Sequence, residues 1–146
     1  MLEGKIKPDA GGSRMILVDS SIWISFFNEP HSRYAITLKE LLEDEEELCL
    51  ADIILTEVLQ GLDDNNTFKK VESILLEFPI VKTSNPATYI HAAQIFRLCR
   101  KAGKTVRRSI DSLISAIAIE NNLELFHNDR DFDRISSCVA LKIYRL

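Results

Sequence analysis

Acidic side chains stand at four places where the sequence also predicts the end of a strand or the first turns of a helix. The segments are ILVDSSIWI, LTEVLQG, SIDSLISAIAI and HNDRDFDRI, and their acids are Asp19, Glu57, Asp111, Asp129 and Asp131. Each acid alone could be an ordinary surface, turn or capping residue. An ionised carboxylate beside a hydrophobic core needs water, a cation or hydrogen-bond donors. The acids as a set therefore raise the possibility of a shared ligand.

A divalent cation is the ligand that such a set favours. Two carboxylates about 4 Å apart repel each other by roughly 4 kcal/mol at an effective dielectric of about 20, so they converge only with compensation. A small number of oxygen ligands, completed by water, suits magnesium or manganese better than zinc. We predict a Mg²⁺ or Mn²⁺ site.

Strand-length apolar segments alternate with segments of helical period, which predicts an α/β fold with a mainly parallel central sheet of about five strands flanked by helices. The predicted strands are residues 15–18, 48–51, 80–83, 123–126 and 141–144. The predicted helices include one capped by Ser32, one bearing the apolar stripe Phe68, Val71, Ile74, Leu75 and Phe78, one starting at residues 84–86 and ending near Gly103, and one from about Ser109 to Asn121.

The carboxyl ends of parallel strands meet at one edge of a sheet, where ligands bind. Asp19 and Asp129 fall on that edge. Glu57 and Asp111 join them if their helices start at the same edge. On the helix after Asp19, we expect Trp23 to pack into the core.

In this order and at these separations, the four segments resemble the acidic motifs of PIN domains, and specifically those of toxin ribonucleases of the VapC type. The resemblance covers residues 15–146. It implies a metal-dependent endoribonuclease whose acids correspond to Asp19, Glu57, Asp111 and Asp129 and whose metal-activated water cleaves RNA to leave a 5′-phosphate and a 3′-hydroxyl. It also implies a cognate VapB-type antitoxin that inserts a basic side chain among the acids, and a homodimeric toxin.

The last motif departs from the family pattern. His127 stands where the family usually has threonine or serine. Asp131 could share or replace the role of Asp129 as the fourth metal ligand. Among the hydroxyls near the first acid, Ser20 or Ser21 could orient Asp19 or a water at the metal.

The chain is acidic, with a formal net charge of −4, yet it contains one basic segment. Six bases lie within twelve residues: Arg97, Arg100, Lys101, Lys104, Arg107 and Arg108. We predict that they hold the RNA backbone beside the metal, because phosphate contacts position a nucleic acid without reading its sequence. The alternative is a solvated helix end.

Three other functions could use a similar acid cluster. An aspartate-nucleophile phosphatase needs a second aspartate two residues after the first, where this chain has Ser21. A receiver-type phosphoacceptor domain needs a lysine after its last strands, and FHNDRDF contains none. A PIN-like RNA-binding module without activity is the third.

Composition fits one domain. Residues 1–14 contain three glycines and a proline, and we predict an artificial leader in front of a single domain, residues 15–146. The three cysteines lack the spacing of zinc or redox motifs and are expected to be free thiols. No segment has the length and hydrophobicity of a membrane span or a secretion signal, so we expect a soluble, cytoplasmic protein without a membrane partner.

Overall fold

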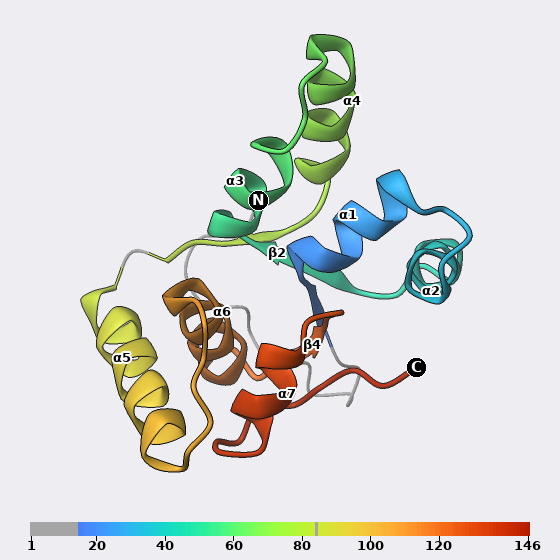
Figure 1. Cartoon of the computed structure of the whole chain (residues 1–146). Helices are drawn as coiled ribbons and strands as arrows, with labels where there is room; N and C mark the ends of the chain where they lie inside the picture. The colour runs from blue at the N-terminus through green and yellow to red at the C-terminus, as the bar shows by residue number, and fades with distance from the viewer. Residues whose placement is uncertain (1–14, 84) are drawn as a thin grey trace.

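The computed structural model describes residues 15–83 and 85–146 (Figure 1). Its sheet contains four parallel strands, β1 (Ile16–Val18), β2 (Leu48–Ala51), β3 (Ile80–Val81) and β4 (Glu124–Phe126), in the order β3-β2-β1-β4. The fifth predicted segment pairs with β4 in parallel through a bridge between Leu125 and Ile143. The predicted α/β fold with a mainly parallel sheet is confirmed, every pairing in the described residues is parallel, and β1 lies at the centre of the sheet.

Seven helices connect the strands in the described residues. They are α1 (Ser20–Asn28), α2 (Arg33–Glu43), α3 (Asp52–Leu59), α4 (Asn65–Leu75), α5 (Pro86–Lys101), α6 (Ser109–Glu120) and α7 (Arg130–Ser136). Helix α1 contacts α2 and α3, and α3 contacts α4, whereas α5, α6 and α7 form a second group (Figure 1). Right-handed crossovers place these two groups on opposite faces of the sheet, because the strand order reverses direction after β3.

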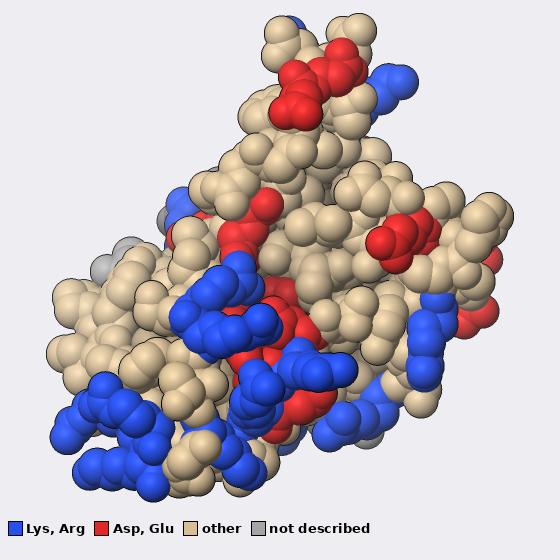
Figure 2. All heavy atoms as spheres, in the orientation of Figure 1, with Lys and Arg blue, Asp and Glu red and all other residues tan. Residues whose placement is uncertain are grey.

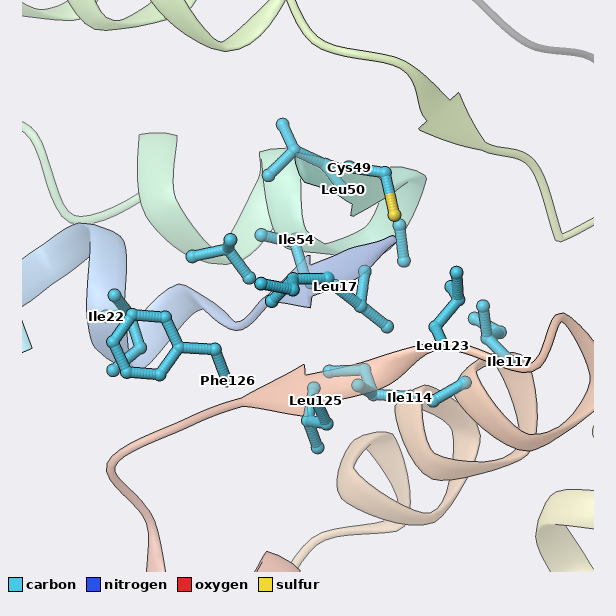
Figure 3. Close-up of a cluster of buried hydrophobic side chains, with 14 of the residues drawn as sticks. Leu17, Ile22, Cys49, Leu50, Ile54, Ile114, Ile117, Leu123, Leu125 and Phe126 are labelled. Carbon is cyan, nitrogen blue, oxygen red and sulfur yellow. The ribbon is translucent and has the colours of Figure 1, made fainter. Parts of the chain in front are cut away.

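The core lies between these layers. Leu17, Leu50, Leu125 and Phe126 from the strands pack among side chains that include Ile22, Ile54, Ile114 and Ile117 from the helices (Figure 3). All residues of β1 and β2 are buried, as expected for strands covered on both faces. Trp23 is fully buried and stacks on Phe27, which confirms its core position.

Two details differ from the sequence predictions. Strand β3 ends at Val81 instead of residue 83, because the backbone N–H and hydroxyl of Thr83 donate to the Asp52 carboxylate at 3.0 and 3.1 Å instead of continuing the ladder. Ile74, expected in the buried stripe of α4, is 38% exposed. The helix predicted from residue 84 begins at Pro86 with Asn85 as its N-cap, and residue 84 lies outside the described residues.

Other predictions concern the whole chain. All three cysteines are free thiols, and Cys49 and Cys99 are buried. The predicted leader, residues 1–14, lies outside the described residues. Within the described ranges, none of the helices has the length and apolar character required to cross a membrane.

Candidate metal centre

The five acids lie on four elements whose ends meet beside the carboxyl edge of the sheet. Asp19 is the N-cap of α1, Asp129 is the N-cap of α7, and Asp111 and Asp131 lie in the first turns of α6 and α7. Glu57 reaches the same place from α3, where it is almost entirely buried. Three helix N-termini thus surround the acids, and their dipoles favour negative charge there.

Asp19 follows β1 directly and is 1% exposed. Its Oδ2 accepts hydrogen bonds from the Ser21 backbone N–H at 3.1 Å and from the Ser21 hydroxyl at 2.6 Å. Its Oδ1 is buried and has no hydrogen-bond partner. Desolvation raises the pKa of Asp19 to about 6, although the Ser21 hydrogen bonds lower it. A buried, unpartnered carboxylate oxygen is costly unless a ligand satisfies it.

Both serines predicted to orient the site contact its acids. The Ser20 hydroxyl donates to Glu57 Oε1 at 3.2 Å. The Ser21 hydroxyl, besides donating to Asp19, accepts the backbone N–H of Asn128 at 3.0 Å. Ser21 therefore ties the loop after β4 to the acid that follows β1.

Asp111 is fully buried at the start of α6. Burial raises its pKa to about 6, and the neighbouring Arg108 guanidinium opposes that rise. Burial also raises the pKa of Glu57, again against Arg108. These carboxyls lose hydration without gaining enough donors in return, as expected of groups arranged for a cation.

Asp129 and Asp131 differ in how far their oxygens are already engaged. Each offers an oxygen within 4.8 Å of the others in a group with Asp111, so all three could hold one ion. Both oxygens of Asp131 accept from the Arg107 Nε, and Oδ1 also accepts from Arg134 at 2.6 Å. Asp129 Oδ1 caps α7 through the Asp131 N–H, whereas its Oδ2 lies 3.8 Å from Arg108. Asp129 therefore retains the freer oxygen.

The basic segment divides into two parts. Arg107 and Arg108 turn toward the acids, with Arg108 contacting Glu57 at 3.4 Å and Asp111 at 2.8 Å. Figure 2 shows acidic side chains in a hollow of this face with basic side chains lying over them. Arg97, Arg100, Lys101 and Lys104 have no hydrogen bond or ion pair to the five acids, and Lys104 donates to Ser137 at 2.6 Å. More bases gather over the end of α5 (Figure 2).

His127 and Arg134 complete the surroundings of the last motif. His127 Nδ1 accepts the Asp129 backbone N–H at 3.1 Å, which orients the loop that carries the acid. Sequence reasoning did not identify Arg134. Arg134 follows Asp131 by three residues on a helix, and this spacing could have predicted their ion pair.

The donor set fits a hard divalent cation. It contains carboxylate oxygens without nearby thiols, a trio whose ligand atoms lie within 4.8 Å, and the unpartnered Asp19 Oδ1. The comparison with protein families agrees with this chemistry, because the model of the PIN domain matches residues 16–137. The chain belongs to the PIN domain family.

Comparison with individual proteins gives one relative in sequence and two similar solved structures. The chain is 34% identical over 129 residues to Ribonuclease VapC11 from Mycobacterium tuberculosis, an alignment that covers 88% of this chain and 96% of that relative. Among solved structures, it is similar to FitAcB from Neisseria gonorrhoeae, with 25% identity, a TM-score of 0.68, and coverage of 90% and 97% of the two chains. DNA-bound VapBC from Salmonella typhimurium shares the fold, with 19% identity, a TM-score of 0.71, and coverage of 90% and 97%.

Membership of the PIN domain family decides between the functions that the sequence analysis left open. It confirms the predicted resemblance to VapC-type toxins, and it excludes the receiver and phosphatase interpretations, which require other folds and other residues around their acids.

Proposed function

We propose that this PIN domain is a toxin endoribonuclease of the VapC type that uses Mg²⁺ or Mn²⁺ and is neutralised by a cognate antitoxin in the cytoplasm. The observation that carries the proposal is the meeting of buried carboxylates at one edge of the sheet, with Asp19 Oδ1 left without a donor. The 34% identity to a VapC ribonuclease supports RNA as the substrate.

Each acid has a proposed role. Asp19, Glu57, Asp111 and Asp129 hold the ion, and Asp131 positions Arg107 and the first turn of α7. When bound, the ion supplies Lewis-acid stabilisation of the negative charge that develops on the phosphodiester. Ser20 and Ser21 fix the orientations of Glu57 and Asp19, and three helix N-termini add positive potential.

Arg108 gives the site a movable positive charge. Its guanidinium contacts Glu57, Asp111 and Asp129, while half of its side chain is exposed. Because a guanidinium pairs with phosphate as well as with carboxylate, Arg108 can exchange its acid contacts for a phosphate oxygen of the RNA. Arg107, which is paired with Asp129 and Asp131 at the rim, is placed for a neighbouring phosphate.

The same contacts suggest how an antitoxin inhibits the site. FitAcB and VapBC are complexes in which a PIN-domain chain was solved together with its partner. In this chain, Arg108 demonstrates that the acidic hollow accommodates a guanidinium. A basic side chain of the antitoxin would occupy the hollow in the same way, and we also propose a homodimer.

Cleavage assays on the full chain test this proposal. The wild type should cleave structured RNA in Mn²⁺ and lose all cleavage in excess chelator. Asp111→Asn should be inactive, while Asp63→Asn, a matched change at an exposed acid outside the cluster, should retain full activity. Cleavage in chelator, or by Asp111→Asn, would contradict a metal-dependent mechanism.

A further inference from the structure

A pocket opens between the first turn of α2, the end of β4, α7 and the C-terminal segment. Its volume is about 250 Å³. Cavities for drug-sized ligands run from about 300 to 1,000 Å³, so this one suits a smaller, single-ring or double-ring fragment. None of the roles assigned above uses it.

Aromatic side chains form one wall of this pocket. The ring centroids of Tyr34 and Phe126 are 6.4 Å apart, and those of Phe126 and Tyr144 are 5.2 Å apart. Phe126 is buried, whereas the two tyrosines are partly exposed. The buried phenylalanine thus supports two tyrosine rings that remain accessible to a flat ligand.

Polar groups form the other wall. His127 Nε2 is buried without a hydrogen bond, and the nearest charge is Asp133 Oδ1 at 3.4 Å. Asp133 in turn lies 3.9 Å from Arg145, and the Arg33 guanidinium lies 5.7 Å from the centre of the Tyr34 ring. The polar wall therefore carries charges of both signs, two arginines and one aspartate, beside the C-terminal residue Leu146.

Two hydrogen bonds link residues of the pocket lining to the acids of the metal centre. The Phe126 carbonyl accepts the Asp19 N–H at 3.0 Å, and His127 Nδ1 accepts the Asp129 N–H at 3.1 Å. The residues that line the pocket are therefore adjacent in the chain, or hydrogen-bonded, to two of the proposed metal ligands. An RNA strand with its phosphate at the carboxylates can extend toward this pocket.

We infer that the pocket binds one unstacked nucleobase of single-stranded RNA, next to the phosphodiester that is cut. Tyr34 and Tyr144 stack on the base, His127 and Asp133 contact its edge, and Arg33 and Arg145 face the adjoining phosphate. Aromatic stacking and edge contacts are the means by which proteins recognise unpaired RNA bases, and a guanidinium beside the rings can pair with the phosphate of the same nucleotide. The identity of the ligand as RNA rests on the proposed function.

Nucleotide binding without metal tests the pocket directly. The ¹⁵N-labelled full chain, in chelator, is titrated with each of the four nucleoside 5′-monophosphates while backbone amide shifts are followed. We expect at least one of them to shift the amides around Tyr34, His127 and Tyr144. Tyr34→Leu and Tyr144→Leu should weaken binding about fivefold or more, the lower end of what base stacking contributes.

The control is Tyr89→Leu, which removes a tyrosine that is 52% exposed on α5, away from this pocket. It should bind like the wild type, and thermal melts establish that each variant is folded. The inference is overturned if no monophosphate shifts the backbone amide signals of the pocket residues, or if both folded pocket variants bind like the wild type. The remaining candidate occupant of the pocket would then be a segment of a protein partner.

Cleavage of a randomised RNA pool in Mn²⁺ then separates this inference from the proposed function. Tyr34→Leu should lose a base preference at one position beside the cut, and Tyr89→Leu should keep it. Cleavage with an unchanged preference in both pocket variants overturns the inference and leaves the nuclease standing. Binding at the pocket amides by a wild type that cuts no RNA supports the site and refutes the nuclease.

Discussion

Asp19 and Asp131 are both buried aspartates at helix N-termini, and their surroundings have opposite effects. Asp19 is 1% exposed and keeps one oxygen without a partner, and its pKa is raised to about 6, mainly by desolvation. Asp131 is 0% exposed. Desolvation also acts to raise its pKa, but hydrogen bonds from Arg107 and Arg134 outweigh it and lower the pKa below its usual value.

We propose that the contrast separates a carboxylate arranged for an ion from one arranged for the fold. Burial alone does not distinguish them, because both are equally removed from water. The number of donors does. Asp131 receives the hydrogen bonds that an ionised carboxylate needs, whereas Asp19 receives only part of them and remains available to a cation.

The largest expected effect is on catalysis by Asp19→Asn. Cleavage should fall by more than about 100-fold, beyond what is typical for a residue that only supports a metal ligand. Stability in chelator should stay unchanged or rise by about 1 kcal/mol, because asparagine caps helices as well as aspartate does and one repelling charge is removed. Thermal melts should also show that Mn²⁺ stabilises the wild type more than the variant. A variant clearly less stable in chelator, with the wild-type response to Mn²⁺, would make Asp19 a structural cap.

Asp131→Asn should show the reverse pattern. The change removes charge-assisted hydrogen bonds from two arginines, which should lower the free energy of unfolding by about 2 kcal/mol. The response to Mn²⁺ should remain, and cleavage should fall by no more than about tenfold at temperatures where the variant is folded. Urea denaturation with and without Mn²⁺ measures the free energy of unfolding and its response to the ion. Loss of the Mn²⁺ response would instead assign Asp131 as the fourth ligand.

The pH dependence of stability should also differ between the two aspartates. The carboxyls of Asp19 and Asp111 bind protons more tightly in the folded protein than in the unfolded one, because their pKa values are raised to about 6. In chelator, their contribution to the free energy of unfolding is therefore fully present below about pH 4 and is lost as the pH rises through about 6. Asp131 has the opposite sign, since its contribution is present above the unfolded pKa and is lost as the pH falls through its lowered folded pKa. Melts of Asp19→Asn should therefore fall less than those of the wild type between pH 4 and 6.5. If the melting temperatures of the wild type and of Asp19→Asn change with pH in parallel, the raised pKa of Asp19 is contradicted.

The smallest expected effect is that of Arg108→Gln on metal affinity. Its half-exposed ion pairs are each worth at most about 1 kcal/mol, so their removal should tighten Mn²⁺ binding by only about threefold. RNA binding should weaken and depend less on salt. Arg100→Gln serves as the control, since Arg100 contacts the Phe96 ring away from the acids. Equal Mn²⁺ affinity in both variants would show that Arg108 does not compete with the ion.

Much of this arrangement follows from the sequence because it depends on periodicity. The alternation of apolar strands and amphipathic helices determines a parallel sheet, and the sheet brings Asp19 and Asp129 to one edge. Caps at Ser32 and Asn85 could likewise be predicted, since their side chains satisfy local backbone donors.

Side-chain direction was not predictable in the same way. The spacing of the basic segment is compatible with six bases facing RNA, but Arg107 and Arg108 turn inward to the acids. The direction of these two arginine side chains depends on ion pairs that form only in the folded structure, so the local sequence does not determine it. Similarly, the pocket beside His127 requires residues from α2, β4, α7 and the C-terminal segment, so no single motif indicates it.

The pairing of β1 with β4 bears on the biogenesis of the protein. Ile16, Leu17 and Val18 find their partners at residues 124–126, which the ribosome synthesises more than a hundred positions later. A nascent chain therefore carries Asp19 long before β4 and α7 exist to complete the hollow around it. Because non-local pairing must wait for the later segment, the carboxylates assemble only as translation nears its end. The proposed metal centre therefore cannot form until nearly the whole chain has been synthesised.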